Sequence, residues 1–134
     1  MELKASSSEK SRIAVVDDDA SVREALMGLL RSAGFGAETY ASAEEFLRSG
    51  GLEETECLIL DVRMPGIGGV ELRRYLELAG HDIPVIFITA HGDDSTRAQA
   101  LGANVVAFLT KPFDDEALLE AIERALGPGG GQPH

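Results

Sequence analysis

The sequence predicts a doubly wound α/β fold, in which a five-stranded parallel sheet is covered by helices on both faces. Two observations lead to this prediction. Five short apolar runs alternate along the chain with five segments whose apolar residues recur at helical spacing. The apolar runs also lack the polar alternation of a strand with one face in water, which indicates burial on both faces. The 134 residues, 44% of them hydrophobic, are enough for one compact domain.

The first half of the pattern begins with RIAVV at residues 12–16, a β-branched run that predicts the first strand. Apolar residues then recur at helical spacing through residues 22–33, which predicts an amphipathic helix closed by Gly34. AETYA at residues 37–41 predicts the second strand. SAEEFLRSG at residues 42–50 has a serine and a glutamate at capping-box spacing, so a short helix is expected there.

The second half repeats this alternation. CLIL at residues 57–60 predicts the third strand, and residues 72–79 carry the helical pattern of a segment that Gly80 ends. PVIFI at residues 84–88 predicts the fourth strand, with its proline at the first position, where a missing donor is tolerated. DDSTRAQALG at residues 93–102 predicts a weaker helix, because it has few large apolar residues.

The fifth strand, the closing helix and the two ends of the chain complete the predicted domain organisation. VVAFL at residues 105–109 predicts the fifth strand, and residues 117–126 predict the closing helix. The folded domain is therefore expected at residues 12–126. Residues 1–11 are polar and Ser-rich, typical of a flexible leader. GPGGGQPH at residues 127–134 predicts neither helix nor strand, but a flexible tail or linker stub.

Five such units are expected in the strand order 2-1-3-4-5 of flavodoxin-like proteins, although another winding is compatible with the pattern. In these sheets ligands bind outside the carboxyl ends of the strands, at the switch point between the first and third strands. Polar residues follow four of the apolar runs at that edge, namely Asp17, Asp18, Asp19, Asp61, Thr89 and Lys111, the last of which precedes Pro112. We expect the aspartates to converge on one cleft, bordered by the threonine and the lysine.

These side chains have a coherent chemistry. Neighbouring carboxylates repel one another unless a cation neutralises them, and oxygen ligands with open water positions suit Mg²⁺. A carboxylate can also attack a phosphoryl group and form an aspartyl phosphate. The ion, a lysine and a hydroxyl would then stabilise the transferring oxygens.

The composition limits the kinds of partner and the cellular compartment that we expect for this chain. A formal net charge of -11 repels phosphate backbones, so this chain is not expected to bind nucleic acid directly, whereas a divalent cation or a basic partner would be attracted. Cys57, the only cysteine, lies in an apolar run and is expected in the core of a protein from a reducing compartment. No segment approaches the roughly 20 apolar residues that span a bilayer, and the leader lacks a signal-peptide core. We expect a soluble, cytoplasmic protein.

Four motifs together resemble the receiver domain of bacterial two-component response regulators. They are VVDDD, LDVRMPGIGG, IFITAHG and FLTKPF, and the resemblance covers residues 12–126. No single motif is specific, but their order and spacing are. The segments HGD and RMPG look like those of two-domain transcription regulators with a helix-turn-helix effector.

The resemblance implies roles for the residues at the strand ends. Asp61 resembles the phosphoacceptor. Asp17 and Asp18 match the acidic pair that holds Mg²⁺, together with Asp61 and the backbone carbonyl of Arg63, and Asp18 would be the more direct ligand of the pair. Lys111 would pair with the phosphoryl oxygens.

Further roles concern switching and lifetime. Thr89 would hydrogen-bond the phosphoryl group, and Phe108 matches the switch aromatic that turns inward when the threonine moves. The Lys111–Pro112 peptide bond would be cis. Arg63 and His91 occupy the positions that flank the phosphoryl group and tune how fast water removes it.

Other residues are interpreted without a phosphoryl role. Asp19 is expected to cap the first helix, with a metal or supporting role as the alternative. Receivers usually have glycine at the position of Asn104 and often an acid at that of Ala107, and Gly102 falls where a helix would continue. These departures concern the end of the fourth helix and the fifth strand. Arg73 and Arg74 have no assigned role and are expected on an exposed helix face.

The resemblance implies a phosphorylation switch, that is, a phosphoacceptor signalling domain and not an enzyme. A sensor histidine kinase would donate the phosphoryl group to Asp61. The surface of the fourth helix, fifth strand and fifth helix would then change its partners, with phospho-dependent homodimerisation as one outcome. DNA would be reached only through an effector domain that this chain lacks.

Two alternatives remain open. A haloacid-dehalogenase-type phosphatase would use Asp17 as nucleophile, since D-x-D-x-S after a strand imitates its motif. However, its late acidic motif and cap insertion are missing. The other alternative is a receiver-like interaction module that works without phosphorylation, against which the full set of site residues argues.

Overall fold

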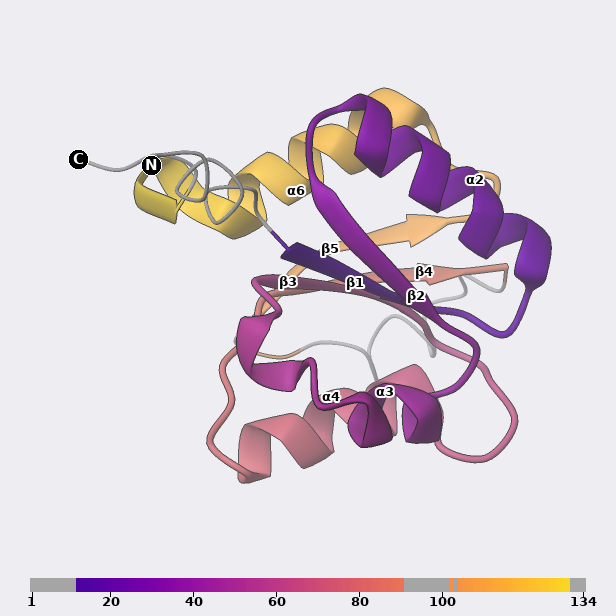
Figure 1. Ribbon diagram of the computed structural model, residues 1–134, viewed down its shortest axis with the longest axis vertical. Coiled ribbons are helices and arrows are strands. Elements are labelled where there is room, and N and C mark those ends of the chain that lie inside the picture. The colour runs from indigo at the N-terminus through magenta and orange to yellow at the C-terminus, as the bar shows by residue number, and fades with distance from the viewer. Residues whose placement is uncertain (1–11, 91–101, 103, 131–134) are drawn as a thin grey trace, which may run out of the picture.

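The computed structural model describes residues 12–90, 102 and 104–130. The elements in chain order are β1 Arg12–Val16, α2 Ala20–Ser32, β2 Gly36–Tyr40, α3 Ala43–Ser49, the short 3₁₀ helix η1 Leu52–Glu54, β3 Cys57–Asp61, α4 Gly69–Leu78, β4 Val85–Thr89, β5 Val105–Thr110 and α6 Asp115–Gly130. Figure 1 shows the sheet as a central layer, with α2 and α6 on one face and α3 and α4 on the other. Within the described residues, no helix has the length and apolar character needed to cross a membrane.

The sheet has the predicted topology. Its five strands pair in parallel in the order β2-β1-β3-β4-β5, so β1 and β3 are neighbours and their carboxyl ends meet. Residues 93–101 of the fourth predicted helix lie outside the described residues. The observed β2 begins and ends one residue before the predicted strand, and η1 was not predicted. The fold class and strand order predicted from the apolar runs are therefore confirmed.

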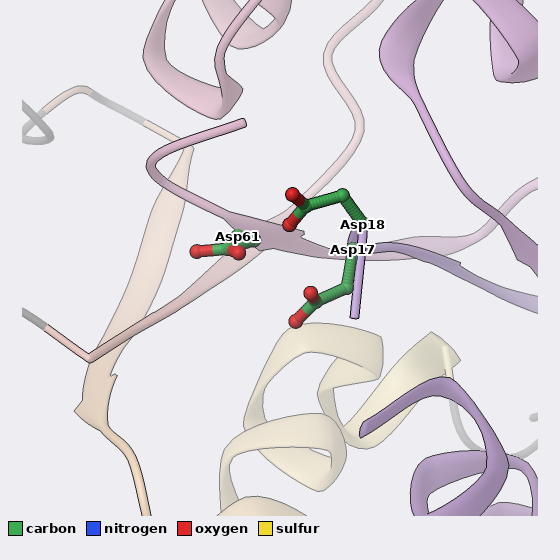
Figure 2. A group of neighbouring side chains, drawn as sticks. All are labelled: Asp17, Asp18 and Asp61. Atoms are coloured by element: carbon green, nitrogen blue, oxygen red, sulfur yellow. The ribbon is translucent and has the colours of Figure 1, made fainter. Parts of the chain in front are cut away.

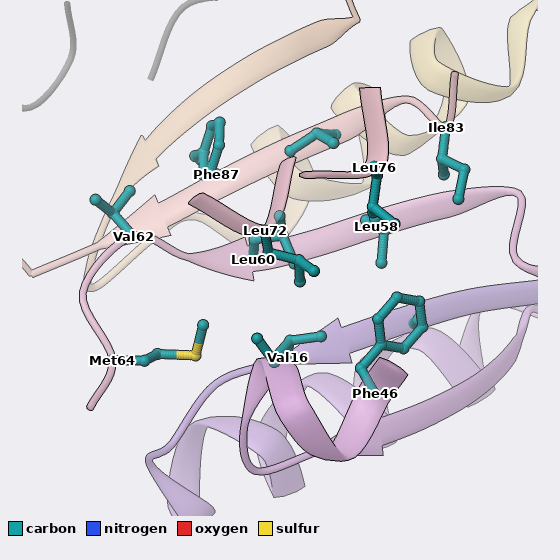
Figure 3. Close-up of a cluster of buried hydrophobic side chains, with 13 residues drawn as sticks. Val16, Phe46, Leu58, Leu60, Val62, Met64, Leu72, Leu76, Ile83 and Phe87 are labelled. Atoms are coloured by element: carbon teal, nitrogen blue, oxygen red, sulfur yellow. The ribbon is translucent and has the colours of Figure 1, made fainter. Parts of the chain in front are cut away.

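The core consists of two apolar clusters, one on each face of the sheet. The α3–α4 cluster includes Phe46, Leu60, Leu72, Leu76 and Phe87, and Figure 3 shows it filling the space between the strands and these two helices. The α2–α6 cluster includes Leu26, Leu30, Ile59, Leu118 and Ile122. Cys57 is fully buried in the latter, and this burial raises the pKa of its thiol to about 12. Its predicted place in the core is confirmed.

Side-chain caps fix the starts of two helices. Asp19 is the N-cap of α2: its carboxylate accepts the Ser21 N–H at 2.9 Å and the Ser21 hydroxyl at 2.8 Å. Ser42 is the N-cap of α3 and accepts the Glu45 N–H at 3.0 Å. The Glu45 carboxylate accepts the N–H of Ala41, one residue before the cap, at 2.7 Å. Both predicted helix starts, including the capping role of Asp19, are confirmed.

Two expectations at the chain surface are wrong. Arg73 is 4% exposed and lies in the interior side of α4, whereas its neighbour Arg74 is exposed as expected. Its polar partners are Glu77, four residues later on the same helix, and Asn104, 31 residues later. Helical backbone is also found up to Gly130, within residues 127–134, where neither helix nor strand was expected. Gly127 breaks the helix with φ 70° and ψ 163°, and a further turn follows that begins with proline, a residue favoured in the first turn of a helix.

Candidate functional site

The polar residues predicted at the strand ends lie at one edge of the sheet. Asp17 follows β1, Asp61 ends β3, Thr89 ends β4, and Lys111 follows β5. Because neighbouring parallel strands end side by side, these four side chains come from four adjacent strand ends. Figure 2 shows Asp17, Asp18 and Asp61 projecting from β1 and β3 into the same region.

Asp17 is fully buried, and both its backbone and its side chain form hydrogen bonds. Its Oδ1 accepts the N–H of Asp19 at 2.9 Å, and its carbonyl oxygen accepts Nη1 of Arg23 at 2.8 Å. Its N–H donates to the carbonyl of Tyr40, at the end of β2. The turn that carries the acid pair is thus fixed by contacts with α2 and β2.

Asp61 is almost completely buried. Burial raises the pKa of Asp61 to about 6, and the nearby carboxylate of Asp17 contributes to the rise. Lys111 and the backbone N–H of Arg63, 3.4 Å from Oδ1, act in the opposite direction. At neutral pH Asp61 is therefore mostly ionised, but its carboxylate is less solvated than an ordinary aspartate.

Lys111 bridges the two buried acids. Its Nζ lies 2.9 Å from Oδ2 of Asp17 and 3.4 Å from Oδ2 of Asp61. Burial alone would lower the pKa of Lys111, but the two carboxylates outweigh it and the pKa is raised. The Lys111 N–H donates to the carbonyl of Thr89 at 2.7 Å, and the Lys111–Pro112 peptide bond is cis. The ammonium is thus held at the site as a permanent positive charge.

The acid cluster fits a divalent cation. One carboxylate oxygen from each of Asp17, Asp18 and Asp61 lies within 4.8 Å of the others. Asp18 is exposed, so the cluster is open to water on one side. Oδ2 of Asp17 is buried, and the Lys111 ammonium lies 2.9 Å from it. A set of carboxylate oxygens with one side open to water suits Mg²⁺.

The backbone after Asp61 turns tightly back toward the acid. The Gly69 N–H donates to the carbonyl of Val62 at 3.0 Å. A Cβ at Gly69 would collide with the carbonyl oxygen of Asp61, so only glycine permits this approach. The glycines of the RMPGIGG motif therefore bring the start of α4 against the end of β3.

The remaining predicted residues have different surroundings. Thr89 is fully buried, and Arg63 is exposed two residues after Asp61. Phe108 is partly buried: its ring packs on the α3–α4 cluster, with its centroid 6.4 Å from that of Phe87. His91 lies outside the described residues, so its contacts are not described.

Sequence reasoning missed one residue at this site. Arg23 lies on α2, six residues after Asp17, and its bond to the Asp17 carbonyl is a contact of side chain with backbone. Only the placement of Arg23 in the second turn of the helix after the acid run could have pointed to it. Every residue has a backbone carbonyl, so a side chain that binds one cannot be identified from the residue pattern.

Comparison with known proteins identifies a family. Residues 13–123 match the response regulator receiver domain. The chain is 46% identical over 120 residues to the response regulator protein TodT of Pseudomonas putida F1, covering 90% of this chain and 53% of TodT. It is 41% identical over 119 residues to the transcriptional regulatory protein FixJ of Azorhizobium caulinodans, covering 89% of this chain and 56% of FixJ. The chain thus spans about half the length of the curated relatives it matches.

A solved structure of a relative has a similar fold. The crystal structure of FixJ-N superimposes with a TM-score of 0.77 at 40% identity, covering 87% of this chain and 93% of that one. These findings show that the chain belongs to the response regulator receiver domain family.

Proposed function

We propose that this chain accepts a phosphoryl group from the phosphohistidine of a sensor histidine kinase onto Asp61. The observation that carries the proposal is the surrounding of Asp61: a nearly buried carboxylate, next to two further acids and 3.4 Å from a lysine ammonium. A desolvated carboxylate is a better nucleophile than one in water, and the cationic neighbour keeps it ionised.

In the transfer, a carboxylate oxygen of Asp61 forms a bond to phosphorus while the bond from phosphorus to the histidine nitrogen breaks, and the electron pair stays on that nitrogen. Asp17, Asp18, Asp61 and the carbonyl of Arg63 would hold a magnesium ion, which neutralises charge on the transferring oxygens when bound. Lys111 balances the added negative charge from the side of β5. Arg23 holds the Asp17 carbonyl, so that the acid pair keeps its orientation.

The phosphorylated state would act through β4 and β5. Thr89 hydrogen-bonds the phosphoryl group, and Phe108 turns toward the space that Thr89 leaves. The surface formed by the fourth predicted helix, β5 and α6 then changes its preference for partners, a second copy of the chain included. Because the chain spans about half of its curated relatives, DNA binding would belong to an additional effector domain.

The alternative phosphatase would require Asp17 as the nucleophile. Asp17 is fully buried, accepts the Asp19 N–H and lies 2.9 Å from the lysine ammonium, so attack by this carboxylate is hindered. The second alternative, a module that works without phosphorylation, gives no reason for burying two neighbouring acids, an arrangement that lowers the stability of the fold.

The test is incubation with acetyl phosphate and Mg²⁺, followed by intact-mass and peptide mass spectrometry. We expect one phosphoryl group on Asp61 and none on Asp61→Asn. Asp82→Asn, at an exposed aspartate near the opposite edge of the sheet, is the matched control and should be labelled normally. Label on Asp17 would favour the phosphatase, and no label on the wild type, under conditions that label a known receiver, would favour the interaction module.

A further inference from the structure

A buried arginine lies outside the acid site, on α4. Arg73 is 4% exposed, and its Nη1 donates to Oε1 of Glu77 and to Oδ1 of Asn104, each at 3.0 Å. Its Nε is buried without a hydrogen-bond partner. Burying a guanidinium with incomplete compensation costs stability, and groups retained at such a cost can serve conformational specificity. The transfer proposed above gives Arg73 no role.

Asn104 connects this arginine to the sheet. Its Nδ2 donates to the carbonyl of Ile83 at 2.7 Å, and its own carbonyl accepts the N–H of Val85 at 2.9 Å. Both partners lie at the start of β4. The residue just before β5 is therefore bound to the start of β4 through side chain and main chain, while Arg73 binds the same side chain from α4.

Gly102 leaves room for the guanidinium. A Cβ at this position would lie 2.5 Å from Cζ and 2.6 Å from Nη1 of Arg73, so any side chain would displace the arginine. Gly102 and Asn104 both depart from the usual receiver pattern, and one arrangement accounts for both. None of the described non-glycine residues has a positive φ, so Asn104 does not replace the usual glycine by adopting a left-handed backbone. Arg73, Gly102 and Asn104 together are called the arginine clamp.

The clamp lies next to an irregularity in the ladder between β4 and β5. Val85 pairs with Val105, but Ile86 pairs with Ala107, so β5 contains one extra residue, Val106. The packing agrees: Val106 and Ala107 both contact the α2–α6 cluster, and the residues on either side contact the α3–α4 cluster. Two consecutive residues on one face are the mark of a β-bulge.

The bulge decides where the end of β5 lies. Beyond it Phe108 pairs with Phe87 and Thr110 with Thr89, and the Lys111 N–H reaches the Thr89 carbonyl. A regular ladder from the same first pair would place Phe108 opposite Ile88, facing the other cluster, and would move Lys111 one residue farther along. The register at the start of β5 therefore affects both residues.

We propose that the arginine clamp sets the register of β5 and so positions Lys111 at the acid site. By holding Asn104 against the start of β4, the clamp makes the strand take up its extra residue at Val106. Arg73 and Asn104 are positioning residues: their described bonds are to Glu77, Ile83 and Val85 and to each other. The proposal rests on the proposed function in one respect, that Lys111 assists transfer to Asp61.

The test compares Arg73→Leu and Asn104→Gly with Arg74→Leu, an exposed position on the same helix. Phosphorylation by acetyl phosphate is measured at a temperature where circular dichroism shows each variant folded, and Mg²⁺ affinity is measured by calorimetry. We expect phosphorylation to be slower by about ten-fold or more in both clamp variants, because misplacing a catalytic group by about 1 Å can cost up to about a hundred-fold in rate. Mg²⁺ affinity should not fall, since the three aspartates belong to β1 and β3, and the double variant should lose no more than either single variant.

Hydrogen exchange of the Lys111 amide supplies a readout that does not depend on phosphorylation. We expect faster exchange in both clamp variants, recovery in Arg73→Lys, which retains a charged donor, and no change in Arg74→Leu. Unchanged exchange, or a loss of Mg²⁺ affinity in parallel with the rate, would overturn the proposal. If the wild-type chain takes no phosphoryl group, the proposed function fails, but exchange at Lys111 still decides whether the clamp sets the register. Asn104→Ser serves if the larger changes prevent folding.

Discussion

Asp61 meets two opposing demands. As a nucleophile it must be ionised, yet its burial beside Asp17 favours the protonated form and raises its pKa to about 6. Lys111 limits this rise, so that the carboxylate is ionised at neutral pH while remaining poorly solvated. The free chain therefore carries a destabilising charge at the residue that would react.

This charge makes the effect of Asp61→Asn on stability depend on pH. A carboxyl group whose pKa is raised on folding destabilises the folded state as pH rises from its unfolded value, near 4, through its folded value of about 6. Without Mg²⁺, we expect Asp61→Asn to be more stable than the wild type by about 1–2 kcal/mol at pH 7.5, after allowance for screening by solvent. The difference should shrink between pH 6 and pH 4.

Thermal unfolding followed by circular dichroism at several pH values measures this difference. Asp82→Asn, at an exposed aspartate, should show no comparable gain. A stabilisation by Asp61→Asn that stays constant from pH 4 to pH 7.5 would contradict the raised pKa.

Arg63 and His91 are expected to set the lifetime of the phosphorylated chain. Arg63 is exposed two residues after Asp61, and His91 lies two residues after Thr89 in the sequence. We expect Arg63→Ala and His91→Ala to change the half-life of the purified phosphoprotein, measured by the loss of label with time. Arg74→Ala is the control. The hypothesis fails if both half-lives equal that of the wild type.

At the scale of elements, β4 and β5 form the pair that would transmit the signal. Thr89 is buried at the end of β4, and Phe108 lies on β5 against Phe87. Thr89→Ala removes the hydroxyl but leaves the acids and Lys111 in place. We therefore expect normal labelling of Asp61 but loss of phospho-dependent dimerisation, measured by size-exclusion chromatography with light scattering.

The neighbouring threonine provides the control for this experiment. Thr110 pairs with Thr89 across the ladder but is exposed, so Thr110→Ala should retain both labelling and dimerisation. Dimerisation of phosphorylated Thr89→Ala at the wild-type level would show that the threonine does not transmit the signal.

The elements differ in how well the sequence predicts them. The strands and the strand-end residues Asp17, Asp61 and Lys111 could be predicted because apolar periodicity and the rule for parallel sheets are both local in the sequence. The Asp19 cap could be predicted because its partner, Ser21, is two residues away. By contrast, the burial of Arg73 depends on Asn104, 31 residues later.

The register of β5 was also beyond sequence reasoning. VVAFL is apolar throughout, so it contains no alternation from which the extra residue at Val106 could be inferred. Patterns of burial identify a strand, but pairing between strands is decided by contacts that are distant in the chain. The departures at Gly102 and Asn104 were visible in the sequence, although their common cause, the guanidinium of Arg73, was not.

At the scale of the whole molecule, the acid site is a source of instability that a cation can relieve. Three carboxylates lie within reach of one ion, and the single positive charge of Lys111 offsets only part of their negative charge. A ligand that binds only the folded state stabilises it, by about 2.7 kcal/mol at a concentration one hundred times its Kd. We expect Mg²⁺ to raise the Tm of the wild type, and to do so less in Asp18→Ala.

Differential scanning calorimetry across a Mg²⁺ titration checks this expectation. Asp82→Ala, which removes one acid far from the cluster, controls for the change in net charge and should respond as the wild type does. An equal rise in Tm for Asp18→Ala and Asp82→Ala would exclude Asp18 as a ligand.

The burial of Cys57 has a practical consequence for labelling. It is the only cysteine of the chain, it is fully inaccessible, and the pKa of its thiol is about 12, so very little reactive thiolate exists at neutral pH. A thiol reagent would therefore modify the native chain only when it opens, and the modification rate would report the frequency of opening. A second cysteine placed at the exposed Leu78 could accept a fluorophore selectively, with the natural cysteine left in place.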